Sequence, residues 1–459
     1  MSKDNFLQFP DGFHWGTATS AYQIEGGVNR DGRGKSIWDT FSHTPGKIRH
    51  GHTGDVAADH YCRWQDDVNL MAELGYKAYR FSVAWPRIQP AGMGAPNTAG
   101  LDFYDRLVDG LLDKGITPFL TLYHWDLPQA LQDQGGWANR ETAFRFAEYA
   151  GLVAERLGDR VLHWTTLNEP FVAAFAGNFL GEHAPGIQDA GVALATVHNL
   201  LLGHGLAVPV LRAEAGRPIE AGITLNLTSV HPHSDDPLDH SAAQRYDAVQ
   251  NRLFLDALMT GKYPDLLLAQ FGPLLPPLPA EDFQKFTAPI DFLGINYYNR
   301  TVIRHDPDIP LVNFRNENPT GNEYTLLWEI YPQGLYEVLT RVWRDYHPSK
   351  LFVTENGAAM PDGVDADGRV RDVRRTRYIR DHLVQCHRAI QEGVPLQGYF
   401  AWSLMDNFEW AYGYEMRFWI VYVDFASQQR IVKDSGRWFS EAARRNGFDL
   451  HTGTPYFPC

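Results

Sequence analysis

The chain has 459 residues, of which 44% are hydrophobic, and carries a net charge of −14 with an isoelectric point of about 5.7. This acidic balance argues against a nucleic-acid partner, because phosphate binding requires a basic face. The first ten residues lack the apolar core of a signal peptide, and no apolar run approaches the roughly 20 residues that span a bilayer. Three widely spaced cysteines, Cys62, Cys386 and Cys459, indicate neither a disulfide framework nor a metal site. We therefore expect a cytoplasmic protein without a membrane partner.

Eight short apolar runs have the composition of buried β-strands. In chain order they are Phe13–Ala21, Ala78–Ala84, Thr117–Tyr123, Leu162–Leu167, Ile219–Leu227, Asp291–Tyr297, Leu351–Thr354 and Leu396–Leu404. Amphipathic helical patterns lie between most of them, at Asp66–Leu74, Leu101–Lys114, Arg140–Leu157, Val192–Ala215 and Arg371–Glu392. Alternation of strand and helix favours a parallel sheet, and eight such units favour a single (β/α)₈ TIM barrel in the α/β class.

The predicted barrel domain covers residues 1–449, and we assign no function to the tail 450–459. Two long insertions, Gly26–Asp59 and Arg300–Glu329, follow predicted strands. In a barrel, long loops in these places form the mouth of the active site. An open doubly wound sheet is the alternative fold. The first strand is not followed by a Gly-x-Gly-x-x-Gly motif, which argues against dinucleotide binding.

Two glutamates stand where predicted strands end. Glu169 follows an apolar, β-branched run and precedes Pro170, and Glu355 follows a similar run and precedes Asn356-Gly357. Breakers in these places are typical of a buried strand that ends in a loop. Because all strand ends of a closed parallel sheet meet at one face, we expect the two carboxyl groups to share a cavity. Paired carboxylates of this kind are what glycoside hydrolysis requires.

Other polar and aromatic side chains fall at the ends of the same predicted strands. They are Gln23, Arg80, His124, Trp125, Asn168, Asn226, Asn296, Tyr298, Trp402, Glu409 and Trp410. Sugar rings present apolar C–H faces and polar edges, so aromatic rings beside hydrogen-bonding groups suit them. The pattern favours a carbohydrate site at this face of the barrel.

The order and spacing of these motifs resemble glycoside hydrolase family 1, the β-glucosidase and β-galactosidase group, from about Phe9 to about Phe448. The matching segments are Phe13-His14-Trp15-Gly16-Thr17-Ala18-Thr19-Ser20-Ala21-Tyr22-Gln23-Ile24-Glu25-Gly26, Tyr123-His124-Trp125-Asp126-Leu127-Pro128, Asn168-Glu169-Pro170, Gly294-Ile295-Asn296-Tyr297-Tyr298, Thr354-Glu355-Asn356-Gly357 and Trp402-Ser403-Leu404-Met405-Asp406-Asn407-Phe408-Glu409-Trp410.

The resemblance implies roles for the two glutamates. Glu355 is then the nucleophile and Glu169 the acid/base of a reaction that retains anomeric configuration, so the carboxyl groups should lie about 5 to 5.5 Å apart. Arg80 matches the family arginine that keeps the nucleophile ionised, and Tyr298 matches the tyrosine that orients it. Glu169 is expected to be protonated at rest, because burial and the charge of Glu355 raise its pKa.

The resemblance also implies a set of sugar-binding residues. Asn168 is expected to bind the 2-hydroxyl, Trp402 to lie under the ring and Trp328 to meet the aglycone. The remaining predicted binding residues are Gln23, His124, Glu409 and Trp410, which match residues that hold the outer hydroxyls, together with Trp125, Asn296 and Phe418.

We expect a retaining β-glycosidase for small β-glucosides or cello-oligosaccharides, with galactosides and fucosides as further candidates and without a cofactor or metal. One alternative is a 6-phospho-β-glucosidase, but Glu409 stands where that subgroup uses serine and lysine, and a carboxylate repels phosphate. Another is an inactive sugar-binding barrel, which would lack one of the two glutamates. The pairs His50 and His52, and His231 and His233, lie in loops without further ligands, so we expect solvated side chains. The sequence leaves the oligomeric state open.

Four places depart from the family pattern. Phe171 follows Asn-Glu-Pro where tryptophan is frequent, Met416 replaces a common lysine, Trp419 replaces glycine, and Ile431-Val432 replaces Thr-Pro. None of these changes removes a catalytic group, but they bear on the shape of the subsites.

Overall fold

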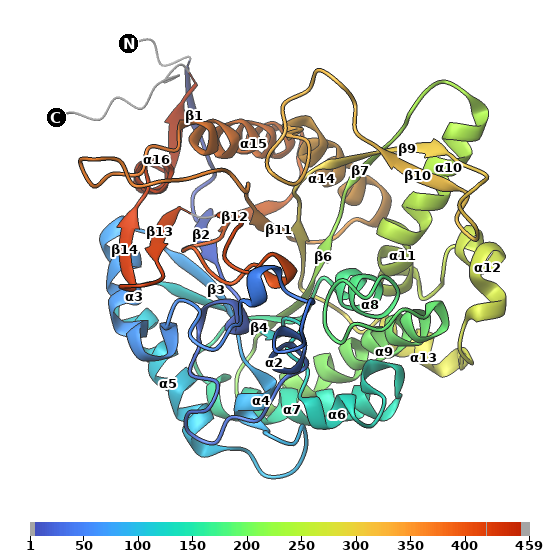
Figure 1. Cartoon of the computed structure of the whole chain (residues 1–459), viewed down its shortest axis with the longest axis horizontal. Coiled ribbons are helices and arrows are strands. Elements are labelled where there is room, and N and C mark those ends of the chain that lie inside the picture. Colours follow the sequence, from blue (N-terminus) through green and yellow to red (C-terminus); the bar gives the residue numbers. More distant parts are fainter. Residues whose placement is uncertain (1–4, 419, 451–459) are drawn as a thin grey trace.

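The computed structural model describes residues 5–418 and 420–450, and its centre is a closed barrel of eight parallel strands (Figure 1). The strands are β2 His14–Ala18, β3 Ala78–Ser82, β4 Thr117–Tyr123, β5 His163–Asn168, β6 Glu220–Asn226, β8 Phe292–Asn296, β11 Leu351–Asn356 and β12 Leu396–Trp402. They neighbour one another in chain order, and β12 pairs with β2 to close the ring. The predicted TIM barrel is confirmed. The domain limits 1–449 stay a prediction, and Trp419 and the tail 451–459 lie outside the described residues.

Most strand ends differ from the prediction by one to three residues, and two of these differences concern the site. The first strand ends at Ala18 rather than Ala21, because the chain turns into the short helix α1 (Ala21–Ile24). The Ala21 N–H donates to the side-chain Oγ of Ser82 in β3 rather than to a backbone carbonyl. The seventh strand continues past Thr354 to Asn356. Glu355 is thus part of the strand end rather than of the loop that follows.

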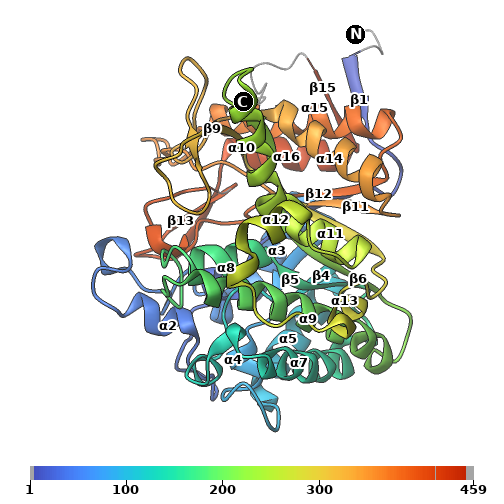
Figure 2. The same cartoon turned by 90° about the vertical axis from the view of Figure 1, so that its right-hand side faces the viewer.

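In the described chain, seven long helices lie between successive barrel strands, α16 follows the last of these strands, and together they surround the barrel (Figures 1 and 2). They are α3 His60–Leu74, α5 Thr98–Asp113, α7 Glu141–Leu157, α9 Ala190–Glu214, α11 Leu253–Thr260, α14 Pro332–Tyr346, α15 Val373–Gln391 and α16 Asp434–Arg445. Their apolar faces cover the outer surface of the strands, which are buried on both sides as parallel strands usually are. The five helices predicted from amphipathic patterns are present, and α3 begins six residues earlier than its pattern indicated.

Helix α9 is long and apolar enough to cross a membrane, the only such helix among the described residues. In its most apolar window, 78% of the residues are buried inside the protein. Buried residues such as Leu200, Leu201 and Leu202 recur along it, and it packs against α7, β5 and β6. Its apolar character is therefore accounted for by burial within the helical layer.

Aromatic side chains fill the lower interior of the barrel. Phe119, Phe292, Phe352 and Phe400 form one buried cluster, and the Phe119 ring stacks on His163 with centroids 4.0 Å apart. Tight packing of large rings leaves no room for a channel through the barrel. The polar groups at the opposite, carboxyl-terminal end of the strands therefore lie next to a packed aromatic layer that excludes water.

The two long insertions contain regular structure. The first holds α2 (Ile37–Ser42), and the second holds β9 (Arg300–His305) and β10 (Phe314–Glu317). Strands β9 and β10 join β7 (Ser229–Pro232) in a separate three-stranded sheet, which the sequence did not predict. Cross-strand pairing thus stiffens a segment that we had interpreted as loop.

Shorter elements complete the described chain. Strand β1 (Phe6–Gln8) pairs with β15 (Gly447–Asp449), so the two described ends lie side by side (Figure 1). The others are α4 Trp85–Ile88, α6 Gln129–Gln132, α8 Pro170–Asn178, α10 Pro237–Asp247, α12 Asp265–Phe271, α13 Ala280–Phe286, β13 Val421–Asp424 and β14 Gln429–Val432.

Gly357 sits where the chain after β11 crosses the end of β12. A β-carbon at this position would overlap the backbone carbonyl of Trp402. We therefore expect Gly357→Ala to lower the free energy of unfolding by about 1 to 3 kcal/mol, the usual cost of overpacking, as measured by urea denaturation. Gly363→Ala is the matched control, because a β-carbon there meets nothing within 4 Å. Equal stability of the two variants would contradict the expectation.

Candidate active site

Glu169 directly follows β5 and Glu355 lies in β11, and both strands are irregular just before these residues. Between Thr165 and Asn168, three steps along β5 oppose two along β6. Between Val353 and Glu355, two steps along β11 oppose one along β8. An extra residue in a strand changes the direction of the side chains that follow, and such irregularities recur next to active sites. Glu169 itself has a left-handed backbone, with φ of 46°.

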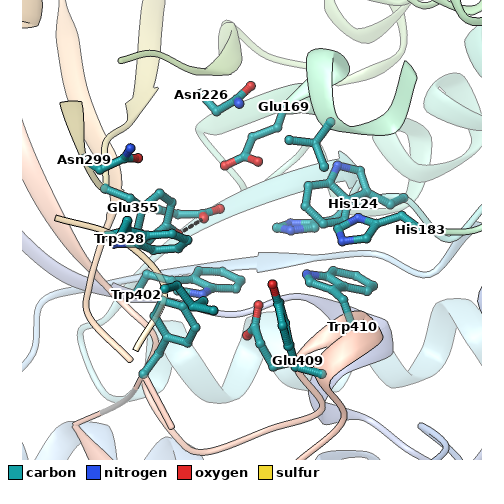
Figure 3. A pocket seen from close by; sticks show the side chains of 16 residues that line it. His124, Glu169, His183, Asn226, Asn299, Trp328, Glu355, Trp402, Glu409 and Trp410 are labelled. Atoms are coloured by element: carbon teal, nitrogen blue, oxygen red, sulfur yellow. Dashed lines mark hydrogen bonds between the residues drawn. The ribbon is translucent and has the colours of Figure 1, made fainter. Parts of the chain in front are cut away.

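A cavity of about 250 Å³ lies at this end of the barrel (Figure 3). Ten of the predicted site residues line it: His124, Trp125, Glu169, Tyr298, Trp328, Glu355, Trp402, Glu409, Trp410 and Phe418. The carboxyl groups of Glu169, Glu355 and Glu409 point toward its centre (Figure 3). Ligand pockets usually measure roughly 300–1,000 Å³, so this cavity suits a small ligand. The predicted carboxyl separation of about 5 to 5.5 Å stays a prediction.

Glu355 is held by two donors. Arg80 Nη1 donates to Oε1 at 2.5 Å, and the Tyr298 hydroxyl donates to Oε2 at 2.6 Å. The side chains of Arg80 and Glu355 are only 1% and 3% exposed, so this ion pair is shielded from water. Burial raises the pKa of Glu355, but the charge of Arg80 and the Tyr298 hydrogen bond oppose that shift. Since both donors favour the carboxylate, Glu355 is the first of the two glutamates to lose its proton.

No cation of the described residues forms an ion pair with Glu169. Burial and the negative charge of Glu355 raise its pKa to about 8, and a hydrogen bond from Asn296 acts in the opposite direction. That bond runs from Asn296 Nδ2 to Oε1 at 2.6 Å, which leaves Oε2 to carry the proton. The amide of Asn296 faces this way because Thr354 donates to its Oδ1 at 2.7 Å. Glu169 is therefore a neutral acid at pH 7 beside an ionised partner.

Asn168 links the ion pair to His124. Its Oδ1 accepts from Arg80 Nη2 at 2.6 Å, so its Nδ2 must face His124 Nε2, at 3.0 Å. Burial and the charge of Arg80 hold the pKa of His124 well below its usual value, which makes the ring neutral. With Nε2 accepting, the proton is on Nδ1, a buried atom without a partner among the described residues. This donor is available to a bound hydroxyl group.

Glu409 and Gln23 meet on the opposite side of the cavity. Gln23 Nε2 donates to Glu409 Oε2 and to Asn407 Oδ1, both at 3.2 Å, while Ser20 Oγ donates to Gln23 Oε1 at 2.7 Å. Burial, together with the charge of Glu355, raises the pKa of Glu409 well above its usual value. Amide and carboxyl oxygens in this arrangement can bind neighbouring sugar hydroxyls.

Four predicted residues lie behind the cavity wall and reach it through hydrogen bonds: Gln23, Arg80, Asn168 and Asn296. Arg80 donates to Glu355, and its role in keeping the nucleophile ionised stays a prediction. Direct contact of the other three with a sugar stays a prediction.

Aromatic rings form much of the wall. Trp402 stacks on His124 with centroids 5.6 Å apart, and Trp125 packs on Trp410 at 4.6 Å. Trp328 packs on Tyr298 at 5.1 Å, and its buried indole N–H has no partner in the described chain. Such rings provide flat apolar surfaces next to polar groups, as sugar binding requires.

Six lining residues were absent from the predicted set: Val172, His183, Asn226, Asn299, Leu327 and Tyr412. Asn226 had been noted at the end of its strand, and Val172 follows the Asn-Glu-Pro motif closely. His183 comes from the loop after α8 and packs on Trp125 at 5.6 Å, and burial lowers its pKa to about 4. No local pattern marks His183, because only the folded chain brings it to the cavity.

His50 and His233, one histidine of each pair, are exposed, as we expected. The other histidine of each pair is partly buried and makes specific contacts. His231 is half-buried and contacts Glu337 at 3.0 Å, and the ring of His52 accepts the Tyr414 N–H at 3.2 Å. No group of three His, Cys, Asp or Glu side chains in residues 5–418 and 420–450 is arranged to hold a metal ion.

The family model of Glycosyl hydrolase family 1 matches residues 6–448. The chain belongs to glycosyl hydrolase family 1. The family resemblance predicted from the motifs is thus confirmed, and glycoside hydrolysis is the chemistry for which this pocket is built.

Known family 1 proteins are similar to the chain over nearly its whole length. The structure of "Family 1 b-glucosidase from Thermotoga maritima" superposes with a TM-score of 0.95 at 50% identity, covering 96% of this chain and 100% of that one. "1,4-beta-D-glucan glucohydrolase" of Thermotoga neapolitana is 50% identical over 96% of this chain and 99% of its own. "Bifunctional beta-D-glucosidase/beta-D-fucosidase" of Bifidobacterium breve is 46% identical, with 94% and 97% covered.

The surroundings of Glu355 favour its carboxylate, and those of Glu169 favour its protonated form. This difference predicts a bell-shaped pH dependence of kcat/KM for an aryl glycoside. Activity should fall as pH rises through the pKa of Glu169, about 8, because the acid loses its proton. It should also fall at low pH as Glu355 becomes protonated. Tyr298→Phe removes a hydrogen bond that favours the Glu355 carboxylate, so the acidic limb should move to higher pH.

Tyr331→Phe provides the control for this change, because Tyr331 packs against Arg300 and does not line the cavity. Its pH profile should match that of the wild type. An unchanged acidic limb in Tyr298→Phe would contradict the role assigned to the Tyr298 hydroxyl.

Proposed function

We propose that this protein is a retaining β-glucosidase that removes terminal β-D-glucosyl residues from small glucosides. The observation that carries the proposal is the pair of buried carboxyl groups in one sugar-sized cavity, where Glu355 is paired to Arg80 and no cation of the described residues pairs with Glu169. Both are glutamates, so neither half of the catalytic pair is missing, which argues against an inactive sugar-binding barrel. The names of family relatives from Thermotoga support the glucosidase assignment.

The reaction proceeds by two displacements. The Glu355 carboxylate attacks the anomeric carbon while Glu169 gives its proton to the glycosidic oxygen, so that bond breaks and the aglycone leaves as an alcohol. A glycosyl ester of Glu355 remains. Glu169, now a carboxylate, removes a proton from a water molecule that attacks the same carbon, and the ester breaks. Two inversions restore the starting configuration, and Glu169 regains its proton.

The cavity favours an unphosphorylated sugar. No lysine or arginine is among its described lining residues, whereas three glutamates are. A phosphate dianion would thus be buried beside carboxyl groups without a cation, at a large electrostatic cost. β-Fucosides, which lack a 6-hydroxyl, are further substrates of this proposal, and the name of the Bifidobacterium breve relative supports them.

Short cello-oligosaccharides are the natural substrates under this proposal, which the name "1,4-beta-D-glucan glucohydrolase" of one relative supports. We further propose that the enzyme works in the cytoplasm. The free thiol of Cys62 is exposed and that of Cys386 is buried, so neither is paired with the other, as a reducing compartment would allow. Assays of cytoplasmic and secreted fractions test the location, and activity in the secreted fraction would argue against it.

Labelling with a 2-deoxy-2-fluoroglucoside tests the nucleophile. The inactivator should form a stable ester on Glu355, which peptide mapping by mass spectrometry identifies. Glu355→Gln should retain the fold but lose roughly 10⁴-fold or more in kcat, the order of loss seen when other covalent hydrolases lose their nucleophile. A label on any other residue would exclude the assignment.

Glu169→Ala tests the acid/base. Its activity should fall by about 10²- to 10⁴-fold on cellobiose, whose leaving group needs a proton, and much less in the first step on a dinitrophenyl glucoside. Added azide should replace the base-activated water and yield the β-glycosyl azide. Equal losses on both substrates without an azide product would contradict the role.

A further inference from the structure

Glu409 is carried by a tight turn in the loop after β12, here called the 409–413 turn. Within it the Glu409 N–H donates to the Gly413 carbonyl at 2.7 Å, and the Gly413 N–H donates to the Trp410 carbonyl at 3.0 Å. Glu409, Trp410 and Tyr412 of this turn all line the cavity. The position of the turn therefore decides where three wall residues stand.

The Glu409 side chain has little support of its own. In the part of the chain that the structure describes, its carboxyl accepts one hydrogen bond, from Gln23 at 3.2 Å, and it pairs with no cation. Its location thus depends on the backbone of the 409–413 turn more than on contacts of the carboxyl group.

A segment from the first long insertion lies against this turn. In residues 48–55, here called the strap, His52 Nδ1 accepts the Tyr414 N–H at 3.2 Å, and the Tyr414 hydroxyl donates to the Thr53 carbonyl at 2.7 Å. A β-carbon on Gly413 would lie 2.5 Å from His52 Nδ1. The His52 imidazole therefore packs directly against the 409–413 turn. Glycine at position 413 permits this close approach because it has no β-carbon.

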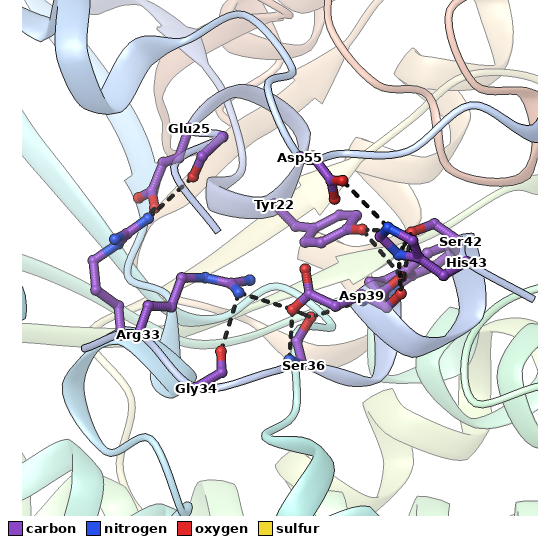
Figure 4. A network of polar contacts seen from close by, with 12 residues as sticks. Tyr22, Glu25, Arg33, Gly34, Ser36, Asp39, Ser42, His43 and Asp55 are labelled. Atoms are coloured by element: carbon purple, nitrogen blue, oxygen red, sulfur yellow. Dashed lines mark hydrogen bonds and ion pairs between the residues drawn. The ribbon is translucent and has the colours of Figure 1, made fainter. Parts of the chain in front are cut away.

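The base of the strap is fixed by a polar network (Figure 4). His43 Nε2 contacts Asp55, the last residue of the strap, at 3.2 Å, and His43 Nδ1 contacts the Asp39 carbonyl at 2.7 Å. The Asp39 carboxyl accepts from the Ser36 N–H at 2.6 Å and from Arg33 at 2.8 Å. His52 thus extends from an anchored loop, so it can hold the turn in place.

The hydrogen bond from Tyr414 requires a neutral His52 ring, since a protonated imidazole has no acceptor. Desolvation and the neighbouring His50 lower the pKa of His52, and Glu415 opposes that shift. The ring can therefore act as an acceptor at neutral pH.

We propose that His52 is a positioning residue for sugar recognition. By holding the 409–413 turn, it places Glu409 where the carboxyl can accept hydrogen bonds from the 4- and 6-hydroxyls of the bound glucosyl ring. This inference rests on the proposed β-glucosidase function and assigns part of its specificity to a residue that does not line the cavity.

The test compares nitrophenyl β-glucoside with its 6-deoxy analogue. His52→Ala should lower kcat/KM about tenfold on the glucoside, the order of one hydrogen bond, and about threefold or less on the 6-deoxy substrate, which lacks one contact to Glu409. His52→Asn should restore the wild-type ratio, because its side-chain oxygen can accept the Tyr414 N–H. If His52→Ala does not fold, His52→Phe removes the acceptor while keeping a ring against Tyr414.

His233→Ala is the matched control. Its side chain is exposed, and it belongs neither to the strap nor to the turn nor to the cavity lining, so the wild-type ratio should persist. Equal losses on both substrates in His52→Ala, or a failure of His52→Asn to restore the ratio, would overturn the inference. A wild-type protein inactive on both substrates would instead overturn the proposed function, so the two failures are distinguishable.

Discussion

The buried ion pair between Arg80 and Glu355 is the interaction on which the rest of the site depends. Both side chains are almost fully shielded, so Glu355 can remain charged only because the guanidinium and the Tyr298 hydroxyl replace its lost hydration. Breaking a buried pair of this kind typically costs about 3 to 5 kcal/mol, because an uncompensated charge remains. The charge that Arg80 preserves on Glu355 then raises the pKa of Glu169 and of Glu409.

The surroundings of Glu355 and Glu169 differ, although the two side chains are chemically identical. Glu355 is given donors that favour the carboxylate, whereas Glu169 is given one amide and the field of a neighbouring negative charge. In the proposed mechanism, environment rather than residue type therefore separates the nucleophile from the acid. The aromatic floor of the barrel contributes by excluding water, which strengthens each of these electrostatic interactions.

The backbone around the cavity is strained at the residues that matter. Trp125, Glu169 and Trp410 all have positive φ values, of 80°, 46° and 47°. Each such conformation costs on the order of 1 to 3 kcal/mol in a residue other than glycine, and it persists only where the surroundings enforce it. Here the closed barrel and the anchored loops do so. The stable scaffold thus holds these residues in strained backbone conformations. Their side chains point in directions that an unstrained strand or turn would not allow.

The sequence by itself determined the fold class and the chemistry. Apolar β-branched runs and amphipathic helices predicted the barrel within a few residues, since those patterns depend on local periodicity and burial. Glu169 and Glu355 stood out because strand breakers follow them. The family motifs predicted most of the residues that line the cavity. Local patterns carry this information because it concerns each segment separately.

Only the tertiary structure decided which residues meet. The extra residues in β5 and β11 arise from register with neighbouring strands, and the contacts of His183 and His52 join segments that are distant in the chain. The second insertion became a paired sheet for the same reason. Such features depend on closure of the barrel and on packing between loops, and neither leaves a periodic signal in the sequence.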